Sequence, residues 1–347
     1  MGELLDIGLP LEEDVATSSP VGVALGKASR SRGNLIPTGS VLLNLALSDN
    51  PYGGYSIGSM ANLVGDSSAG KTVLAWNMFA EVVRDNGFDG YDLIYDDAES
   101  KLQLPLVKLF GKQIERVDIT SSATIEEMDK SIRALLKGKR PFIYVIDSFD
   151  ALSDVEERAK EELKRDYPAK PRLASEMLRK ICGDIRNTRS FFLVVSQTRD
   201  AIGVTFGDKK TRSGGRALKF YCLHEVWLAV KGHIKRKDRE VGVRIRGKTK
   251  KNHLTGKLRE FETYIYFDYG VDDVTPMIEW LVAEGYWKQE KGKLVIKTGS
   301  DFIDATMPKL ISYIEENDLV WQLTEVMADS WLALEESIRT DRPPRYE

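Results

Sequence analysis

One eight-residue stretch constrains the fold of this chain more than any other feature. It is a G-x-x-x-x-G-K-[ST] pattern made by Gly65, Asp66, Ser67, Ser68, Ala69, Gly70, Lys71 and Thr72. The glycines let the backbone turn so that successive N–H groups point at one anion, the lysine adds a positive charge, and the hydroxyl can ligate Mg²⁺. An apolar run at residues 59–64 precedes the pattern, and apolar residues at helical spacing follow it over 71–84. The stretch therefore predicts a strand, a phosphate-binding loop and a helix whose N-terminus faces a nucleotide such as ATP.

Short apolar runs alternate with helical patterns through the first 200 residues. Strands are expected at 91–95, 117–120, 141–146 and 190–196, and helices at 38–47, 125–137 and 173–189. This alternation predicts an α/β fold with a mainly parallel, twisted sheet flanked by helices. Ligands of such sheets bind at the carboxyl ends of the strands, and polar residues follow three of the runs. These residues are Asp96, Asp97, Glu99, Asp147 and Gln197.

Each polar residue at a strand end suits one step of nucleotide hydrolysis. Asp147 follows a rigid apolar strand, where a carboxylate can order Mg²⁺ or its waters beside phosphates. Glu99 is the favoured group to activate the attacking water, although Asp96 and Asp97 compete for this role. Gln197 can reach the γ-phosphate as an amide donor. The expected catalytic residues are thus Lys71, Glu99 and Gln197, and the expected Mg²⁺ ligands are Thr72 and, through water, Asp147.

The charge of the chain is unevenly distributed. Residues 209–259 hold 17 Lys and Arg but three Asp and Glu, whereas the whole chain has a formal net charge of −3. Such asymmetry indicates a surface that faces a polyanion, with a merely solvated basic face as the alternative. Two long segments with basic residues, at 153–171 and 198–215, leave the expected carboxyl ends of strands. Long loops of this kind are usually functional, and here they favour nucleic-acid contacts gated by the nucleotide.

Several classes of protein are not expected. The sequence has no run of 18 apolar residues, and its N-terminus lacks the basic and apolar segments of a signal peptide. Cys182 and Cys222 do not have the spacing of metal ligands. We therefore expect a cytoplasmic protein that is not associated with a membrane.

Taken together, these motifs resemble the RecA-type strand-exchange recombinases, in a diverged, phage-like form. The resemblance spans about residues 33–287 and is most specific in two places that follow Gln197 at the family's distance. The stretches that carry it are 65–72, 97–99, 145–148, 196–197, 202–207 and 214–221. Residues 1–33 have little pattern and are expected to form an arm or linker, in which 20–25 could be an oligomerisation strand or part of a disordered tail. The resemblance implies a RecA-like ATPase core at 34–269, a small α+β C-terminal domain at 270–347, and a nucleoid-associated protein of a prokaryotic or phage-infected cell.

The resemblance also implies roles for residues outside the nucleotide loop. Segments 153–172 and 198–214 correspond to the two DNA-binding loops of the family. Lys251 and His253 match two lysines that reach across the filament interface to the ATP of a neighbour, so His253 departs from the family pattern. Lys219 and Phe220 match other interface positions. The positions that match DNA contacts are Tyr167, Arg172, Arg179, Arg199, Ile202, Gly214, Gly215 and Arg216.

The function implied is an ATP- and Mg²⁺-dependent DNA recombinase. It would form helical homo-oligomeric filaments on single-stranded DNA and pair them with homologous duplex DNA, with single-strand-binding or loader proteins as further partners. Two other functions stay open. One is a hexameric helicase-type motor built on the same core, and the other is a nucleotide-switched protein that anneals single strands or loads another recombinase.

Overall fold

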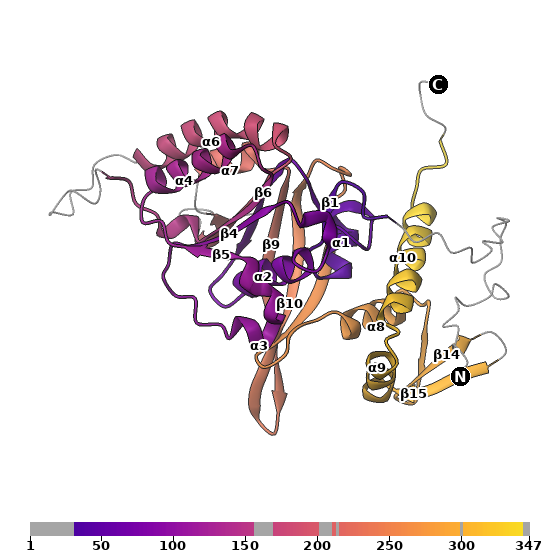
Figure 1. The fold of residues 1–347 in the computed structure, drawn as a ribbon. Coiled ribbons are helices and arrows are strands. Elements are labelled where there is room, and N and C mark those ends of the chain that lie inside the picture. The colour runs from indigo at the N-terminus through magenta and orange to yellow at the C-terminus, as the bar shows by residue number, and fades with distance from the viewer. Residues whose placement is uncertain (1–30, 156–168, 201–209, 213–214, 299–300, 343–347) are drawn as a thin grey trace.

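The computed structural model describes residues 31–155, 169–200, 210–212, 215–298 and 301–342 (Figure 1). Its centre is a ten-stranded sheet in the order β12-β11-β10-β9-β3-β7-β6-β4-β5, with β8 paired to β7. The parallel strands are β3 (Ser59–Gly65), β4 (Asp92–Asp97), β5 (Asp118–Thr120), β6 (Phe142–Asp147), β7 (Phe191–Asp200) and β9 (His224–Arg236). The α/β fold with a mainly parallel sheet is thus confirmed.

Four strands extend this sheet antiparallel. They are β8 (Lys210–Arg212), β10 (Arg239–Asn252), β11 (Glu260–Tyr266) and β12 (Gly270–Asp272). The sequence pattern did not indicate β9 to β12, because charged residues on the solvent-facing side interrupt the apolar runs. The long β9–β10 hairpin extends well beyond the sheet (Figure 1).

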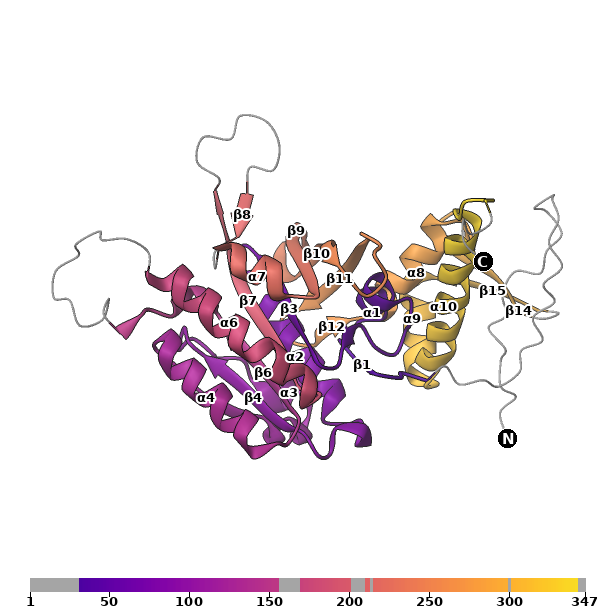
Figure 2. The same ribbon diagram turned by 90° about the horizontal axis from the view of Figure 1, so that it is seen from above.

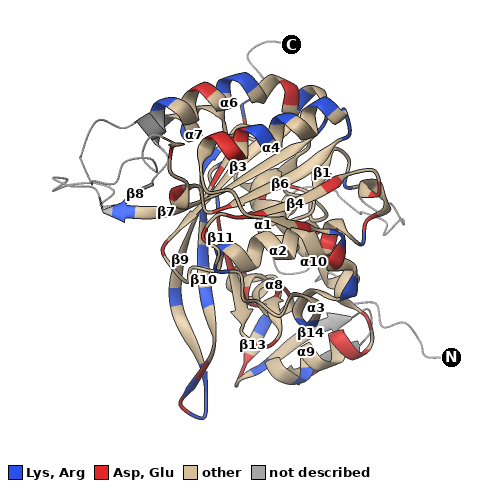
Figure 3. Cartoon of the chain, turned by 60° about the vertical axis from the view of Figure 1, so that its left-hand side comes forward, with Lys and Arg blue, Asp and Glu red and all other residues tan. Residues whose placement is uncertain are grey.

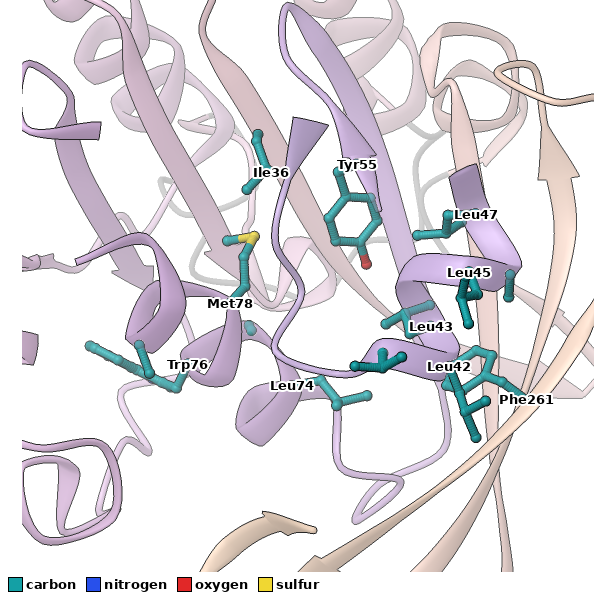
Figure 4. Close-up of a cluster of buried hydrophobic side chains, with 14 of the residues drawn as sticks. Ile36, Leu42, Leu43, Leu45, Leu47, Tyr55, Leu74, Trp76, Met78 and Phe261 are labelled. Atoms are coloured by element: carbon teal, nitrogen blue, oxygen red, sulfur yellow. The ribbon is translucent and has the colours of Figure 1, made fainter. Parts of the chain in front are cut away.

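Helices cover both faces of the sheet. On one face lie α1 (Val41–Ser48), α2 (Lys71–Val82) and α3 (Leu106–Phe110), and on the other α4 (Ile125–Gly138), α6 (Ala169–Asn187) and α7 (Gly215–Tyr221). Two separate hydrophobic clusters result, one on each side of the sheet. In the first, leucines of α1 lie beside Tyr55 and Phe261 of β11, and Trp76 of α2 lies farther along the same cluster (Figure 4).

Two expected boundaries differ from the structure. Helix α6 begins at Ala169 rather than at 173, so Arg172 lies on the helix and not in the preceding loop. Pro171 does not prevent this, because the N–H groups of the first helical turn have no intrahelical partner. Strand β7 continues to Asp200, three residues beyond Gln197, because β8 pairs with its end.

The C-terminal elements pack against α1 rather than standing apart. A three-stranded sheet of β13 (Lys288–Glu290), β14 (Lys293–Thr298) and β15 (Asp301–Thr306) lies beside α8 (Val274–Ala283), α9 (Met307–Glu316) and α10 (Val320–Ser337). Trp287 and Trp331 are buried in the core, whereas Trp321 is 57% exposed. None of the helices in the described ranges is both long and apolar enough to span a membrane.

A half-buried ion cluster joins α10 to the end of α1. Arg259 lies 2.7 Å from a carboxylate oxygen of Asp49, at the end of α1, and 2.6 Å from one of Glu335 on α10. Lys257 contacts the same two carboxylates. The expected division of the chain at residues 33 and 269 stays a prediction, and the arm at 1–30 lies outside the described residues.

Asp273 provides a test of how α1 is held to α8. Both of its carboxylate oxygens lie 3.0 Å from the backbone nitrogen of Val41, the first residue of α1. Burial raises the pKa of Asp273 from 3.8 to about 7. A raised folded pKa means that the native state binds more protons than the unfolded state between about pH 4 and pH 7. The contribution of Asp273 to stability is therefore present at low pH and lost as the pH rises towards 7.

We expect Asp273→Asn to remove this pH dependence while its amide oxygen still accepts the hydrogen bond from Val41. The free energy of unfolding of the variant, relative to wild type, should rise between about pH 4 and pH 7, by about 1.4 kcal/mol for each pH unit. Urea unfolding at several pH values measures this difference. Asp268→Asn, on an exposed turn, is the control, and parallel curves for Asp273→Asn and wild type would contradict the prediction.

Candidate nucleotide-binding site and nucleic-acid interface

The glycine-rich loop connects β3 to α2 as the sequence predicted. Gly70 caps α2 with φ 79°, a left-handed conformation that is strained for residues with a side chain, so the position favours glycine. The ammonium of the buried Lys71 donates to the backbone oxygens of Gly65 (2.9 Å) and Asp66 (2.7 Å). Burial lowers the pKa of Lys71, against the attraction of four carboxylates. The ammonium thus lies inside the loop, where a phosphate would be its natural partner.

Two hard oxygen ligands meet beside the loop. The hydroxyl of Thr72, at the start of α2, donates to Asp147 Oδ2 over 2.5 Å, and the hydroxyl of Tyr95 donates to the same oxygen over 2.7 Å. Burial raises the pKa of Asp147, although these two hydrogen bonds act in the opposite direction. A hydroxyl and a carboxylate in contact fit the oxygen ligands that Mg²⁺ prefers. Sequence reasoning missed Tyr95, whose place in an apolar strand marked it only as a core residue.

Glu99 lies at the centre of a hydrogen-bond network. Its Oε1 accepts from the Ser148 hydroxyl (2.6 Å) and from Gln197 Nε2 (2.7 Å), and Lys101 lies 3.3 Å from Oε2. Burial by itself would raise the pKa of Glu99, but the bonds from Ser148, Lys101 and Gln197 outweigh it and hold the pKa below its ordinary value. The carboxylate is therefore ionised at neutral pH.

The two competing carboxylates serve the backbone and core. Asp96 is fully buried and accepts from the amide and the hydroxyl of Ser122, each over 2.6 Å, and from the Tyr144 hydroxyl. Asp97 accepts from the amide of Leu102 over 3.0 Å. Their hydrogen bonds hold loops in place, whereas Glu99 reaches the Gln197 side chain across the sheet edge. The geometry thus favours Glu99 among the three candidates.

The expected DNA-contacting residues gather around β7, α6 and α7. Arg199 is 67% exposed at the base of the β7–β8 hairpin, and Arg172 and Arg179 are exposed on α6. Gly215 and Arg216 begin α7. Figure 2 shows the β7–β8 hairpin projecting from the sheet near α7. Three further positions lie outside the described residues: Tyr167, Ile202 and Gly214.

Lys251 and His253 are not part of this chain's own phosphate-binding loop. The strand register places Lys251 beside Glu225, which pairs with Asn62, three positions before the end of β3. Its ammonium donates to the oxygens of Lys219 (2.6 Å) and Phe220 (3.1 Å), at the end of α7. His253 is exposed on the following turn. Neither residue belongs to the loop that would hold a nucleotide in the same chain, and the expected role of both towards the ATP of a neighbour stays a prediction.

The basic stretch at 209–259 is partly neutralised by the next strand. Arg244 lies 2.7 Å from Glu262, Lys248 lies 3.1 Å from Glu260, and Arg246 also pairs with Glu260. The acidic residues of β11 fall just outside the basic window in sequence but face it across the sheet. Figure 3 shows further basic positions on β8 and towards the tip of the β9–β10 hairpin. The polyanion-facing surface is thus narrower than the charge count suggested.

Comparison with known proteins gives one consistent result. Residues 15–272 match the family model described as the RecA N-terminal domain. A protein named RecA from Thermus thermophilus is 32% identical over 262 residues, which are 75% of this chain and 75% of that protein. A protein named RecA from Prochlorococcus marinus is 30% identical over 309 residues, 87% of this chain and 77% of the relative.

The Glu99 network predicts how the carboxylate responds to the loss of one donor. Ser148→Ala removes the hydroxyl that donates to Oε1, so the pKa of Glu99 should rise towards its ordinary value. Carbon-13 NMR titration of the glutamate carboxyl groups measures this midpoint. Ser121→Ala is the control, because that hydroxyl donates to the backbone oxygen of Asp97 instead. An unchanged midpoint in Ser148→Ala would show that the bond is absent in solution.

Proposed function

This chain belongs to the RecA family, and on that premise we propose that it is an ATP-dependent DNA recombinase. It would form helical filaments on single-stranded DNA and catalyse pairing and strand exchange with a homologous duplex. The observation that carries the proposal is the hydrogen bond from Gln197 to Glu99. It joins the residue expected to activate water to the strand that leads into the second long loop. A nucleotide that breaks or shifts the hydrogen bond between Gln197 and Glu99 would therefore change the position of the residues that begin this loop.

The residues at the strand ends divide the work of hydrolysis. The amides of the loop and Lys71 bind the phosphates of ATP, and Thr72 and Asp147 would hold Mg²⁺, which neutralises phosphate charge when bound. Glu99, held ionised by its donors, accepts a proton from the attacking water. The side-chain amide of Gln197 carries two N–H groups, of which one donates to Glu99 and the other can donate to a γ-phosphate oxygen. Binding of ATP would thus change the hydrogen bonds of Gln197 at the end of β7.

The basic residues would bind the DNA backbone. Arg172, Arg179 and Arg199 are exposed around the loop bases, where contacts to phosphates give a sequence-tolerant and salt-dependent affinity. Homology would be read by base pairing. Lys251 and His253, which lie away from their own nucleotide loop, would contact ATP bound by the adjacent subunit. A non-closing interface of this head-to-tail kind generates a helical filament.

Two substitutions separate nucleotide binding from hydrolysis. Lys71→Ala should abolish ATP binding, ATPase activity and filament formation, because it removes the charge that the loop directs at the phosphates. Glu99→Gln should bind ATP and remain on single-stranded DNA, with hydrolysis slower by about 100-fold or more. Phosphate release and electron microscopy with single-stranded DNA measure both effects. Lys130→Ala, an exposed lysine of α4, is the matched control.

The same measurements distinguish the other functions. Closed rings in micrographs together with duplex unwinding would identify a hexameric motor. Annealing of complementary strands without invasion of a duplex would identify a mediator. ATPase activity of the wild type without filaments on single-stranded DNA would refute the recombinase proposal.

A further inference from the structure

Strand β7 donates hydrogen bonds to two carboxylates, one from the segment after each of its two neighbours in the sheet. It lies between β3 and β6. The pairing of β3 with β7 ends at Gly65 and Gln197, and that of β6 with β7 ends at Ile146 and Val194. Beyond these points, side chains of residues that follow β3 and β6 make hydrogen bonds to β7. The region concerned is the last part of β7 together with β8, which form the base of the second long loop.

The first carboxylate belongs to the phosphate-binding loop itself. Asp66 directly follows β3, and its Oδ1 accepts a hydrogen bond from the hydroxyl of Thr198, the residue after Gln197. The backbone oxygen of Asp66 also accepts from the Lys71 ammonium at 2.7 Å. One residue therefore contacts both the lysine expected to bind phosphate and the base of the second loop.

The second carboxylate follows the strand that ends in Asp147. Asp150 lies in the short 3₁₀ helix Phe149–Ala151, with a side chain that is only 11% exposed. Its Oδ2 accepts from the backbone nitrogen of Gln197 at 2.7 Å, and its Oδ1 lies 3.9 Å from the guanidinium of Arg199. Asp150 thus supplies the acceptor that β6 no longer provides for this backbone N–H. A charged acceptor makes such a bond stronger than a neutral one.

We propose that Asp66 and Asp150 form a carboxylate clamp on residues 197–199, through which an occupied phosphate-binding loop rigidifies the base of the second loop. The inference rests on the proposed function and adds to it two positioning residues that act alongside the Gln197 side chain. Binding of phosphates orders the loop that contains Asp66. Because Asp66 holds Thr198 directly, that order extends to β7 and β8.

Amide hydrogen exchange of the full chain tests the clamp without DNA. In the wild type, the non-hydrolysable analogue AMP-PNP with Mg²⁺ should slow exchange in residues 197–200 by about tenfold, as expected when a ligand stabilises a local structure. Thr198→Val removes the hydroxyl, and Asp150→Ala removes the acceptor for the Gln197 amide. In each variant the slowing should fall below about twofold. Thr198→Ser, which keeps the hydroxyl, should restore it.

A matched control separates the clamp from a general loss of stability. Thr263→Val removes a buried hydroxyl for which the described residues provide no hydrogen-bond partner. In this variant AMP-PNP should slow amide exchange in residues 197–200 as much as in the wild type. The clamp proposal would be overturned if AMP-PNP slowed amide exchange equally in Thr198→Val and wild type, or did not slow it in the wild type. ATPase measurements with single-stranded DNA on the same preparations test the proposed function separately. The protein could show slowing of exchange that requires Thr198 but neither bind DNA nor have its ATPase activity stimulated by DNA. This result would support the clamp and refute the recombinase proposal.

Discussion

The parallel register of four central strands is the constraint on which the candidate site depends. It pairs Gly65 of β3 with Gln197 of β7, and Asp97 of β4 with Asp147 of β6. Because parallel strands end at the same edge, residues more than a hundred positions apart in sequence come within hydrogen-bond distance. A shift of one residue in any of these pairs would turn the polar side chains to the opposite face. The burial of the strands in two hydrophobic clusters opposes such a shift.

Carboxylates outnumber the lysine at this edge of the sheet. Lys71 lies within reach of Asp147, Glu99, Asp66 and Asp150. The protein tolerates this excess of negative charge because nearly every carboxylate accepts hydrogen bonds from neutral donors, such as hydroxyl groups and backbone amides. These bonds hold the carboxylates in fixed directions. A preorganised site of this kind can exchange lysine–carbonyl contacts for lysine–phosphate contacts with little rearrangement.

The net charge counted along residues 209–259 differs from the charge of the surface that these residues form. The excess of cations between 209 and 259 is real, but β11 follows the window and brings Glu260 and Glu262 against it. Further cations lie on β8 and near the tip of the β9–β10 hairpin, together with exposed arginines of α6 and Arg199. If DNA binds, we expect it along these residues. The paired middle of β10 mainly stabilises the sheet, and exposed pairs of this kind contribute little each.

The sequence by itself determined the local chemistry. The spacing of Gly65 to Thr72 requires a phosphate-binding loop, and apolar runs that end in Asp147 and Gln197 require strands with polar ends, because these features depend on neighbours in the chain. Only the tertiary structure distinguishes the contacts of Glu99 from those of Asp96 and Asp97, since all three follow one strand and differ in what other strands bring near them. It alone also revealed β9 to β12, the neutralising role of Glu260, and the contacts of Asp66 and Asp150 with β7. Each of these depends on pairing between strands that lie far apart in the sequence.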